Sequence, residues 1–425
     1  MAQSQPTHKP QYPPILFGAL CILIGLVIGG AGIFAIISLT NHQECPDCKC
    51  SGQPLTPANN TDLTTGFFNL EPQGENIIYS PLSIQYGLSL LDAGAAGETK
   101  TEIENVLGST ELPKYQNIPD TLSVANGVFI RDSFSNEVLS TYSDTVTQKY
   151  QAEIIYDNFA NANILDNWIK DKTFNLIDKS GAQITPDTEM ILANALAIQM
   201  KWQSQFDDNK TSGRTFYKND NSEITATTMF QHTNADDITY YIDDDTTLLK
   251  MPLEPTDDAA LEFVAVMPSG NLTDYISNLN LADIENKLAE STSASTPKEG
   301  VEIYIPKFKF DYSLKFVDDL KKLGINQAFN PDLADFSNMA SKPLYVSDAI
   351  HSANIDFSEE GIKAAAITVF TMNATAVMPS EEKPVVVRID HPFYFMIRDK
   401  ENGTIWFIGA VYQPNLWEND SAEYR

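Results

Sequence analysis

The sequence predicts an α+β protein with one large domain from about residue 58 to residue 416, followed by a short tail, 417–425. Helical patterns crowd the first half of this region, strand patterns crowd its last third, and no repeat or second linker divides it. Separated helices and strands favour antiparallel sheets over alternating βαβ units. Domains typically hold about 100 to 150 residues, so a domain of this length has to build an unusually large core.

An uncharged apolar run covers residues 15–39. A helix crosses a bilayer with about 20 apolar residues, whereas the apolar stretch of a secretory signal is shorter, about 7 to 15 residues. We therefore expect a transmembrane anchor, or an uncleaved signal; a cleaved signal, which would make the protein secreted, is the alternative. Lys9 precedes this run, and Glu44 and Asp47 follow it. This charge bias puts the tail 1–14 in the cytoplasm and the domain outside the cell.

Residues 40–57 form a linker that contains three of the four cysteines. Close thiols outside the membrane could form one local disulfide or bond between two chains, and a lone CxxC cannot complete a tetrahedral zinc site. A GxxxG pattern in the apolar run could also seat a helix dimer, although a glycine-rich span matches it by chance at least as readily. A homodimer, joined either by disulfides or by the GxxxG helix pattern, therefore remains an alternative. The residues concerned are Cys45, Cys48, Cys50, Gly25 and Gly29.

Capping and apolar spacing predict the helices of the domain. Ser80 precedes Pro81, and a serine cap with proline in the first helical position begins a helix over 81–95. An apolar stripe predicts a helix over 162–178, and apolar spacing that ends at a glycine predicts another over 313–323. Strands are predicted where β-branched and aromatic residues concentrate. They cover 261–267, 301–310, 385–390, 393–398 and 404–412.

Charge and the distribution of reactive side chains exclude several classes of function. Lysine and arginine number 28 against 57 aspartates and glutamates, a net charge of −29. Phosphate backbones would repel such a chain, so nucleic acid is not expected as a partner. The five histidines are scattered, and no metal-binding motif, P-loop or GxSxG motif is present. We therefore expect no metal and no cofactor, and the class of surface enzymes has no motif in its favour.

One segment near the C-terminus does not fit an ordinary fold. Residues 359–378 have one early glycine, small residues at the front, β-branched or aromatic residues behind, and no proline. Alternate positions from Ile362 to Met372 form a largely apolar set, and those from Lys363 to Asn373 form a smaller or more polar set. The pattern fits a strand with one buried face. From the pattern alone, an ordinary strand followed by a loop explains it at least as well.

Several motifs of the domain resemble those of the serpin family, in the family's order, over roughly residues 58–416. They include an N-x-x-x-S-P-x-S-I entry to a helix, an asparagine strand followed by a tryptophan, and an EEG hinge with its alanines. The matching stretches are 76–84, 94–99, 191–197, 306–309, 334–337, 359–361 and 391–393. The resemblance implies a serpin fold, with a large mixed central sheet, further antiparallel sheets, about eight to nine helices and an exposed reactive loop near the C-terminus.

The resemblance also implies a suicide-substrate inhibitor of serine proteases, and not an enzyme. The native fold would be metastable, and the reactive loop, once cut, would insert into the central sheet and trap the acylated protease. Counting the family's spacing from the hinge glycine puts the cut bond between Thr375 and Ala376. The alternatives nearby are Met372, Asn373, Ala374 and Met378. The hinge would be Glu359, Glu360, Gly361, Ile362, Lys363, Ala364, Ala365, Ala366, Ile367 and Thr368.

Five further residues match positions around the place where the family's sheet parts. Ser80, Ser83, Asn194 and His351 match the shutter, and Trp202 matches the breach at the top of the sheet. We expect the histidine to bond to the asparagine, so that their hydrogen bond holds a closed sheet.

Two hinge residues depart from the family's usual pattern. Ile362 stands where threonine or serine is usual, and Lys363 stands where glutamate is usual. Neither is the proline or the buried charge that would block insertion. No arginine or lysine lies between Lys363 and Lys383, so the expected target is an elastase-like or subtilisin-like protease and not a trypsin-like one. A non-inhibitory serpin-fold surface protein with a binding or structural role is the alternative.

Overall fold

The structure, a computed structural model, describes most of the predicted domain. The described residues are 60–71, 74–108, 111–257, 259–315, 317–362 and 383–414, and all of them belong to one compact unit, residues 54–425. The predicted tail, anchor and linker lie outside the described residues. So do most of the reactive segment, at 363–382, and the C-terminal tail.

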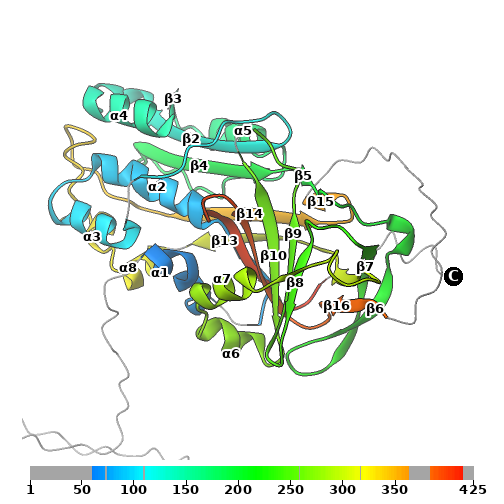
Figure 1. Cartoon of the computed structure of the whole chain (residues 1–425). Coiled ribbons are helices and arrows are strands. Elements are labelled where there is room, and N and C mark those ends of the chain that lie inside the picture. Colours follow the sequence, from blue (N-terminus) through cyan, green and yellow to red (C-terminus); the bar gives the residue numbers. More distant parts are fainter. Residues whose placement is uncertain are drawn as a thin grey trace, which may run out of the picture. The chain divides into compact units, whose positions relative to one another are not determined.

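The described residues contain eight α-helices and four short 3-10 helices (Figure 1). The α-helices are α1 (Asn60–Thr65), α2 (Pro81–Gly94), α3 (Gly97–Leu107), α4 (Ser140–Tyr150), α5 (Asn163–Lys172), α6 (Leu272–Ser277), α7 (Leu281–Ala289) and α8 (Val317–Leu323). The 3-10 helices are η1 (Gly66–Asn69), η2 (Asp132–Glu137), η3 (Asp208–Lys210) and η4 (Gln327–Phe329).

Eighteen strands accompany these helices in the described part of the chain. They are β1 (Ile77–Tyr79), β2 (Leu122–Arg131), β3 (Glu153–Asp157), β4 (Met190–Ile198), β5 (Met200–Lys201), β6 (Ser212–Tyr217), β7 (Glu223–Thr233), β8 (Thr239–Ile242), β9 (Thr246–Pro252), β10 (Leu261–Pro268), β11 (Thr292–Ser293), β12 (Val301–Pro306), β13 (Phe308–Lys315), β14 (Ile350–Phe357), β15 (Gly361–Ile362), β16 (Val385–Arg388), β17 (Phe393–Asp399) and β18 (Ile405–Val411). The strands predicted over 261–267, 385–390, 393–398 and 404–412 are confirmed within two residues.

The helix predicted over 81–95 is confirmed as α2. Ser80 caps it, because the Ser80 hydroxyl accepts a hydrogen bond from the backbone N–H of Ser83 at 3.0 Å. The helix predicted over 162–178 ends early, at Lys172, because Phe174 and Asn175 take positive φ values of 53° and 63°.

Two other sequence-based boundaries are wrong. The helix predicted over 313–323 begins at Val317, because the residues before it extend β13 and pair with β14 as far as Lys315. The strand predicted over 301–310 is two strands that belong to different sheets. They meet at Lys307, whose backbone N–H donates to the carbonyl of Thr227. The chain therefore passes from one sheet to another at this lysine.

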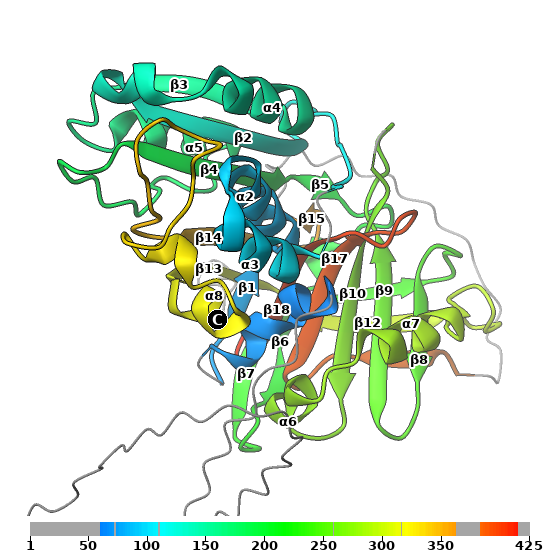
Figure 2. The same ribbon diagram turned by 90° about the vertical axis from the view of Figure 1, so that its left-hand side faces the viewer.

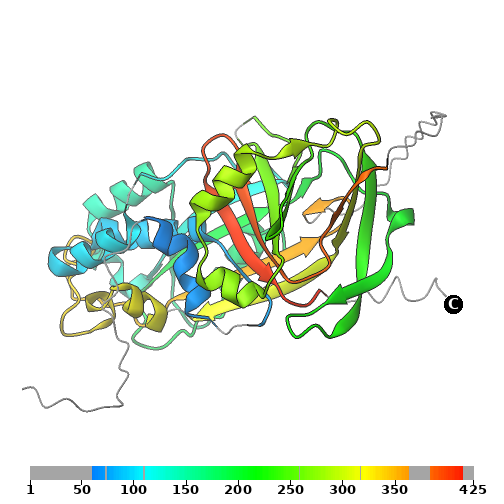
Figure 3. The same cartoon turned by 60° about the horizontal axis from the view of Figure 1, so that its bottom comes forward.

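An antiparallel sheet of seven strands, in the order β1-β18-β17-β10-β9-β8-β11, forms much of the core. Every residue of β17 is buried. The helix α6 packs against β10 and β17, and in Figure 3 the yellow-green helices lie against the red strands. A second sheet has the order β16-β12-β7-β6. Its pair β12–β16 is parallel and its other pairs are antiparallel.

The residues matched to the place where the family's sheet parts, Asn194 on β4 and His351 on β14, lie in two separate ladders. One is β3-β2-β4, and the other is β13-β14-β15-β5. Figure 2 shows the first ladder as a layer above α2, which packs against β4. Phe308 and Phe357 of the second ladder stack at 4.5 Å and contact Phe263 and Phe395 of the seven-stranded sheet. The fold class is thus confirmed as α+β, with mostly antiparallel sheets.

Candidate functional site

Two residues of the predicted hinge belong to the second ladder, β13-β14-β15-β5. Gly361 and Ile362 form β15, which pairs with β5 through Gly361–Lys201 and Ile362–Met200. On its other side, Ile362 pairs with Phe357 of β14. These two hinge residues therefore form a short strand between β5 and β14. Below them, in the described ranges, no ladder joins β4 to β14.

Gly361 is required by close approach of the backbone. A Cβ at this position would lie 2.2 Å from the carbonyl oxygen of Met200 and 2.6 Å from the Cα of Lys201. These are backbone atoms of β5, so they cannot move aside as the end of a side chain can. Only glycine lets the chain lie this close to its neighbour.

Ile362 is 3% exposed, so its side chain is part of the core. Because side chains alternate along a strand, this fixes which face of any longer strand would be buried. In a strand continued from Ile362, the inward face would be that of the apolar alternate set noted in the sequence.

Trp202 holds the turn that precedes the hinge. The indole Nε1 donates to the carbonyl of Ser358 at 2.8 Å, and the backbone N–H of Trp202 donates to the carbonyl of Glu360 at 2.9 Å. The ring is 1% exposed and packs edge-on against Phe357, with the ring centroids 5.1 Å apart. The residue matched to the breach therefore ties the hinge to the end of β5.

Glu359 forms a buried ion pair that sequence reasoning did not find. Its Oε2 lies 2.9 Å from Nζ of Lys307, and its Oε1 accepts a hydrogen bond from the Thr211 hydroxyl at 2.7 Å. The carboxylate and the ammonium group are both shielded from water, at 6% and 8% residue exposure. A buried charge is tolerated only with such partners. Lys307 lies in a stretch that matched the family motifs, but nothing in the sequence gave it this partner.

His351 lies on β14, and Ser80 lies just before α2. The backbone N–H of Ser80 donates to Nε2 of His351 at 3.0 Å. Nε2 is therefore the unprotonated nitrogen of a neutral imidazole. Burial lowers the pKa of His351 to about 4 because the charged form would lose its hydration. A neutral histidine on β14 thus accepts the hydrogen bond of a buried backbone amide.

The expected hydrogen bond between His351 and Asn194 is not formed. Asn194 lies on β4, in the other ladder, and its Nδ2 donates to Asn126 Oδ1 at 2.9 Å and to the Ala125 carbonyl at 3.2 Å. Its Oδ1 is buried and has no hydrogen-bond partner among the described residues. The two matched residues lie in separate ladders and have different partners: Asn194 bonds within its own ladder, whereas His351 accepts from the backbone just before α2.

A small recess, the inter-ladder recess, lies where the two edges face each other. It is lined by Leu196, Ala197 and Ile198 of β4, by Asn354, Ile355 and Asp356 of β14, and by Ile362. Thr173, Leu176 and Ile177, from the connector between α5 and β4, also line it, as do Ile78, Ile397 and Phe407 of the seven-stranded sheet. The early end of α5 allows this, because residues after Lys172 leave the helix and run beside the opening.

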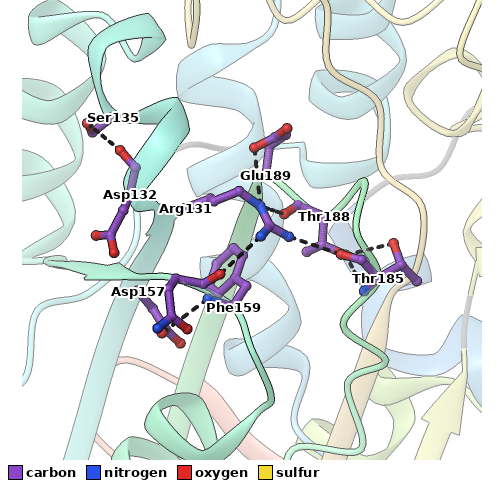
Figure 4. Close-up of polar contacts among 9 residues, drawn as sticks. Arg131, Asp132, Ser135, Asp157, Phe159, Thr185, Thr188 and Glu189 are labelled. Atoms are coloured by element: carbon purple, nitrogen blue, oxygen red, sulfur yellow. Dashed lines mark hydrogen bonds and ion pairs between the residues drawn. The ribbon is translucent and has the colours of Figure 1, made fainter.

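Arg131 fixes the far end of that connector (Figure 4). Its Nε donates to the Thr188 carbonyl at 2.8 Å and its Nη2 to the Thr185 carbonyl at 3.0 Å. Nη1 donates to the Asn158 carbonyl at 3.0 Å, and the guanidinium lies 5.2 Å from the centre of the Phe159 ring. Since Arg131 ends β2, these bonds tie the residues before β4 to the β3-β2-β4 ladder.

The remaining predicted site residues lie outside the described residues. They are Lys363, Ala364, Ala365, Ala366, Ile367 and Thr368 of the hinge, and Met372, Asn373, Ala374, Thr375, Ala376 and Met378 around the cut bond. Among the described residues, no group of three or more histidine, cysteine or acidic side chains is placed to hold a metal. A helix long and apolar enough to cross a membrane is likewise not found there, and residues 15–39 are not among those searched.

Comparison with known proteins identifies the family. The thermophilic serpin tengpin, in its native-state crystal structure, matches with a TM-score of 0.70 and 27% identity over 85% of this chain and 97% of its own. The fold is that of a serpin. An uncharacterized serpin-like protein of Methanosarcina mazei is 29% identical over 398 residues, 87% of this chain and 89% of its own length. Human neuroserpin is 27% identical over 402 residues, 86% of this chain and 93% of its own length.

The family model described as serpin (serine protease inhibitor) matches residues 58–414. This chain belongs to the serpin family. Members of this family are generally protease inhibitors and not enzymes.

Proposed function

We propose that this serpin is a suicide-substrate inhibitor of serine proteases that works by insertion of its cut reactive loop between β4 and β14. The observation that carries the proposal is β15. Its two residues already pair with β5 on one side and with β14 on the other, and both edges below it are unpaired within the described residues. An unpaired strand edge is a template for a further strand.

The two registers agree on where an inserted loop would lie. From Ile362, six steps along an antiparallel strand lead from Met200 to Asn194 on β4, and from Phe357 to His351 on β14. Both put Thr368 level with the shutter pair. Directly opposite residues share a face, so the Thr368 hydroxyl would have the unpaired Oδ1 of Asn194 beside it.

The inter-ladder recess suits the residues that would come first. In the same register, Ala364, Ala365 and Ala366 would lie opposite Ile198, Ala197 and Leu196 of β4, which line it. Alanine adds little volume and has no polar side chain to desolvate. Lys363 would face outward, where its long side chain can keep its charge in water.

The chemistry would be that of the target protease up to its acyl intermediate. The enzyme's serine attacks the cut bond, proposed as Thr375–Ala376 with the nearby alternatives named above, and the new amino terminus leaves. The carbonyl remains esterified to the enzyme. Insertion of the loop then draws the enzyme toward the far end of the sheet and distorts its oxyanion hole before water can hydrolyse the ester.

An elastase-like or subtilisin-like target fits the loop composition. No arginine or lysine lies between Lys363 and Lys383, and a shallow specificity pocket accepts small side chains.

The location proposed is the cell surface, with residues 15–39 as the membrane anchor and the serpin domain outside, where it would meet extracellular proteases. Serpins are often extracellular, which supports this orientation. The GxxxG and cysteine routes to a homodimer belong to the same proposal.

The test is to incubate the protein with pancreatic elastase and with subtilisin. An adduct that survives SDS and contains both chains is expected, together with loss of protease activity. Ala366→Arg should abolish the adduct and turn the protein into a substrate, because its side chain would face the core. Ala365→Arg, the adjacent alanine on the outward face, is the matched control and should still inhibit. Cleavage with full protease activity in the unmodified protein would instead support a non-inhibitory serpin.

A further inference from the structure

The sheet β16-β12-β7-β6 carries aromatic and cationic side chains on its outward face. Tyr304 of β12 is directly opposite Phe230 of β7 and Arg388 of β16, and directly opposite residues point to the same side of a sheet. The ring centroids of Tyr304 and Phe230 are 4.9 Å apart. We call the surface made of Arg214, Phe230, Tyr304, Val386 and Arg388 the cation–aromatic face. The strands β16, β6 and β7 lie together in Figure 1, and no insertion step described above uses this face.

Two guanidinium groups lie on the cation–aromatic face. The guanidinium carbon of Arg214 is 4.6 Å from the centre of the Tyr304 ring, and that of Arg388 is 4.7 Å from the same centre. Both arginines are exposed, and neither has an ion-pair partner among the described residues. Glu302, two positions before Tyr304 on β12, accepts a hydrogen bond from its hydroxyl at 3.1 Å. In a chain with a net charge of −29, this ring gathers two positive charges that a partner with carboxylates can pair with.

The strand β16 is the part of this sheet that such a partner would secure. It has four residues, lies at the edge of the sheet and, among the described strands, pairs with β12 alone. Val387 is buried, whereas Val386 is 43% exposed and lies on the same side as Arg388. Four residues form only a few ladder hydrogen bonds. A partner that contacts Arg388, Tyr304 and Arg214 together would therefore tie β16 to β12 and β6.

The C-terminal segment of this chain has the composition that the cation–aromatic face would bind. Residues 415–425 read NLWENDSAEYR, with three acidic residues, one arginine, one tryptophan and one tyrosine. The match to the serpin family model ends at residue 414, so this segment lies outside the part shared with the family. Carboxylates pair with exposed guanidinium groups. Aromatic side chains pack favourably on other rings, here those of Tyr304 and Phe230.

The segment also starts close enough to reach the face. The strand β18 ends at Val411, which is directly opposite Phe393 at the start of β17. Phe393 is five residues after Arg388. An extended chain spans about 3.3 to 3.6 Å per residue, so Pro414 lies within about 35 Å of Arg388. The eleven residues of the segment extend over about 36 to 40 Å. The segment is therefore long enough to reach the face.

We propose that residues 415–425 dock on the cation–aromatic face of the same chain and hold β16 in its sheet. The acidic side chains of the segment pair with Arg214 and Arg388, and its aromatic side chains pack on the rings of the face. Because the segment is tethered beside the face, its high effective concentration favours even a modest contact. Binding to the closed sheet lowers the population of molecules in which β16 is open. This proposal does not depend on the inhibitory function proposed above.

The test is hydrogen–deuterium exchange of the β16 amides, followed by mass spectrometry on the whole chain. A chain that ends at Pro414 should exchange at Val385–Arg388 about tenfold faster or more, because β16 opens more often. Arg214→Ala in the full chain should have the same effect, although this arginine lies on β6 and not on β16. Lys179→Ala, which removes an exposed cation before β4, is the matched control and should change nothing. Thermal melting confirms that each variant is folded.

A charge exchange separates docking from a general loss of stability. Arg214→Glu should speed exchange in β16, and adding Glu418→Lys and Glu423→Lys should restore slow exchange, because opposite charges face each other again. A defect confined to the sheet would not be repaired by substitutions in the segment. Equal exchange in β16 with and without residues 415–425, or no repair by the two lysines, would overturn the proposal.

A labelled peptide of residues 415–425 tests the contact directly. Fluorescence anisotropy with the chain that ends at Pro414 should show one saturable site, with binding at least tenfold weaker after Arg214→Ala/Arg388→Ala. The same peptide with amides in place of its carboxylates is the control and should also bind at least tenfold more weakly. Equal binding in either comparison would contradict the assignment of the face. Protection of β16 should not depend on protein concentration, and protection lost on dilution would place the segment on a second copy and overturn docking within one chain.

Discussion

The buried ion pair between Glu359 and Lys307 makes the sharpest prediction. Glu359→Gln keeps an oxygen for the Thr211 hydroxyl but removes the negative charge, so the buried Lys307 ammonium loses its ion pair with Glu359. Lys307→Met removes the positive charge and leaves the carboxylate with the Thr211 hydroxyl alone. In both variants a single charge stays at a position that is less than 10% exposed.

Breaking a buried pair by removing one partner costs about 3 to 5 kcal/mol of stability. For a domain of roughly 360 residues, the entropy of unfolding is on the order of 0.75 kcal/mol per kelvin. The two together predict that each single variant melts about 4 to 7 °C below the unmodified protein. The double variant should lose less than the sum of the two, because it removes both members of the pair together.

The assay is thermal unfolding followed by circular dichroism at one fixed scan rate, because the melting temperature of a large domain that unfolds irreversibly depends on the scan rate. Lys170→Met is the control, since Lys170 and Asp178 form an exposed pair at 2.6 Å and exposed pairs contribute little. No measurable shift is expected there. Additive losses in the double variant, or single losses no larger than that of the control, would refute the reasoning from burial.

Three further predictions concern the hinge and the shutter. Stability toward urea should fall by about 3 kcal/mol as the pH drops from about 6.5 to about 4, because only the unfolded chain protonates His351 in that window; a His351→Gln variant that keeps the full pH dependence would contradict this. Gly361→Ala should lower the melting temperature by several degrees because its Cβ meets the β5 backbone, whereas Gly270→Ala, which has open space, should not; equal melting temperatures would rule out the close approach. Trp202→Phe keeps ring packing but loses the bond to Ser358, so proteolysis at the hinge should become faster, and unchanged cleavage would mean that this bond does not hold the turn.

The elements that sequence reasoning located correctly are those fixed by local chemistry. Ser80 and Pro81 determine the start of α2 through capping and the fixed φ of proline. The strands near the C-terminus are apolar on both faces, and such runs form buried strands wherever they are paired.

The errors have a different origin, in pairing partners far along the chain. The residues 313–315 have apolar spacing that also suits a helix, but β14 offers them a ladder. Lys307 and Glu359 are 52 residues apart, and no periodicity links them. Asn194 and His351 were expected to meet because both match one family site, yet Asn194 bonds to Asn126 of its own ladder and His351 accepts from the backbone before α2.

The two residues of β15 also bear on how a cut loop would find its place. A strand that must enter a sheet from solution first has to fix its direction and its register, and a slip by one residue would turn its apolar side chains to the wrong face. Here Ile362 is already paired on both sides, so each later residue extends a row that has begun. Insertion of the cut loop would therefore need no separate nucleation step. Its rate would depend on how readily β4 and β14 separate ahead of the inserting residues.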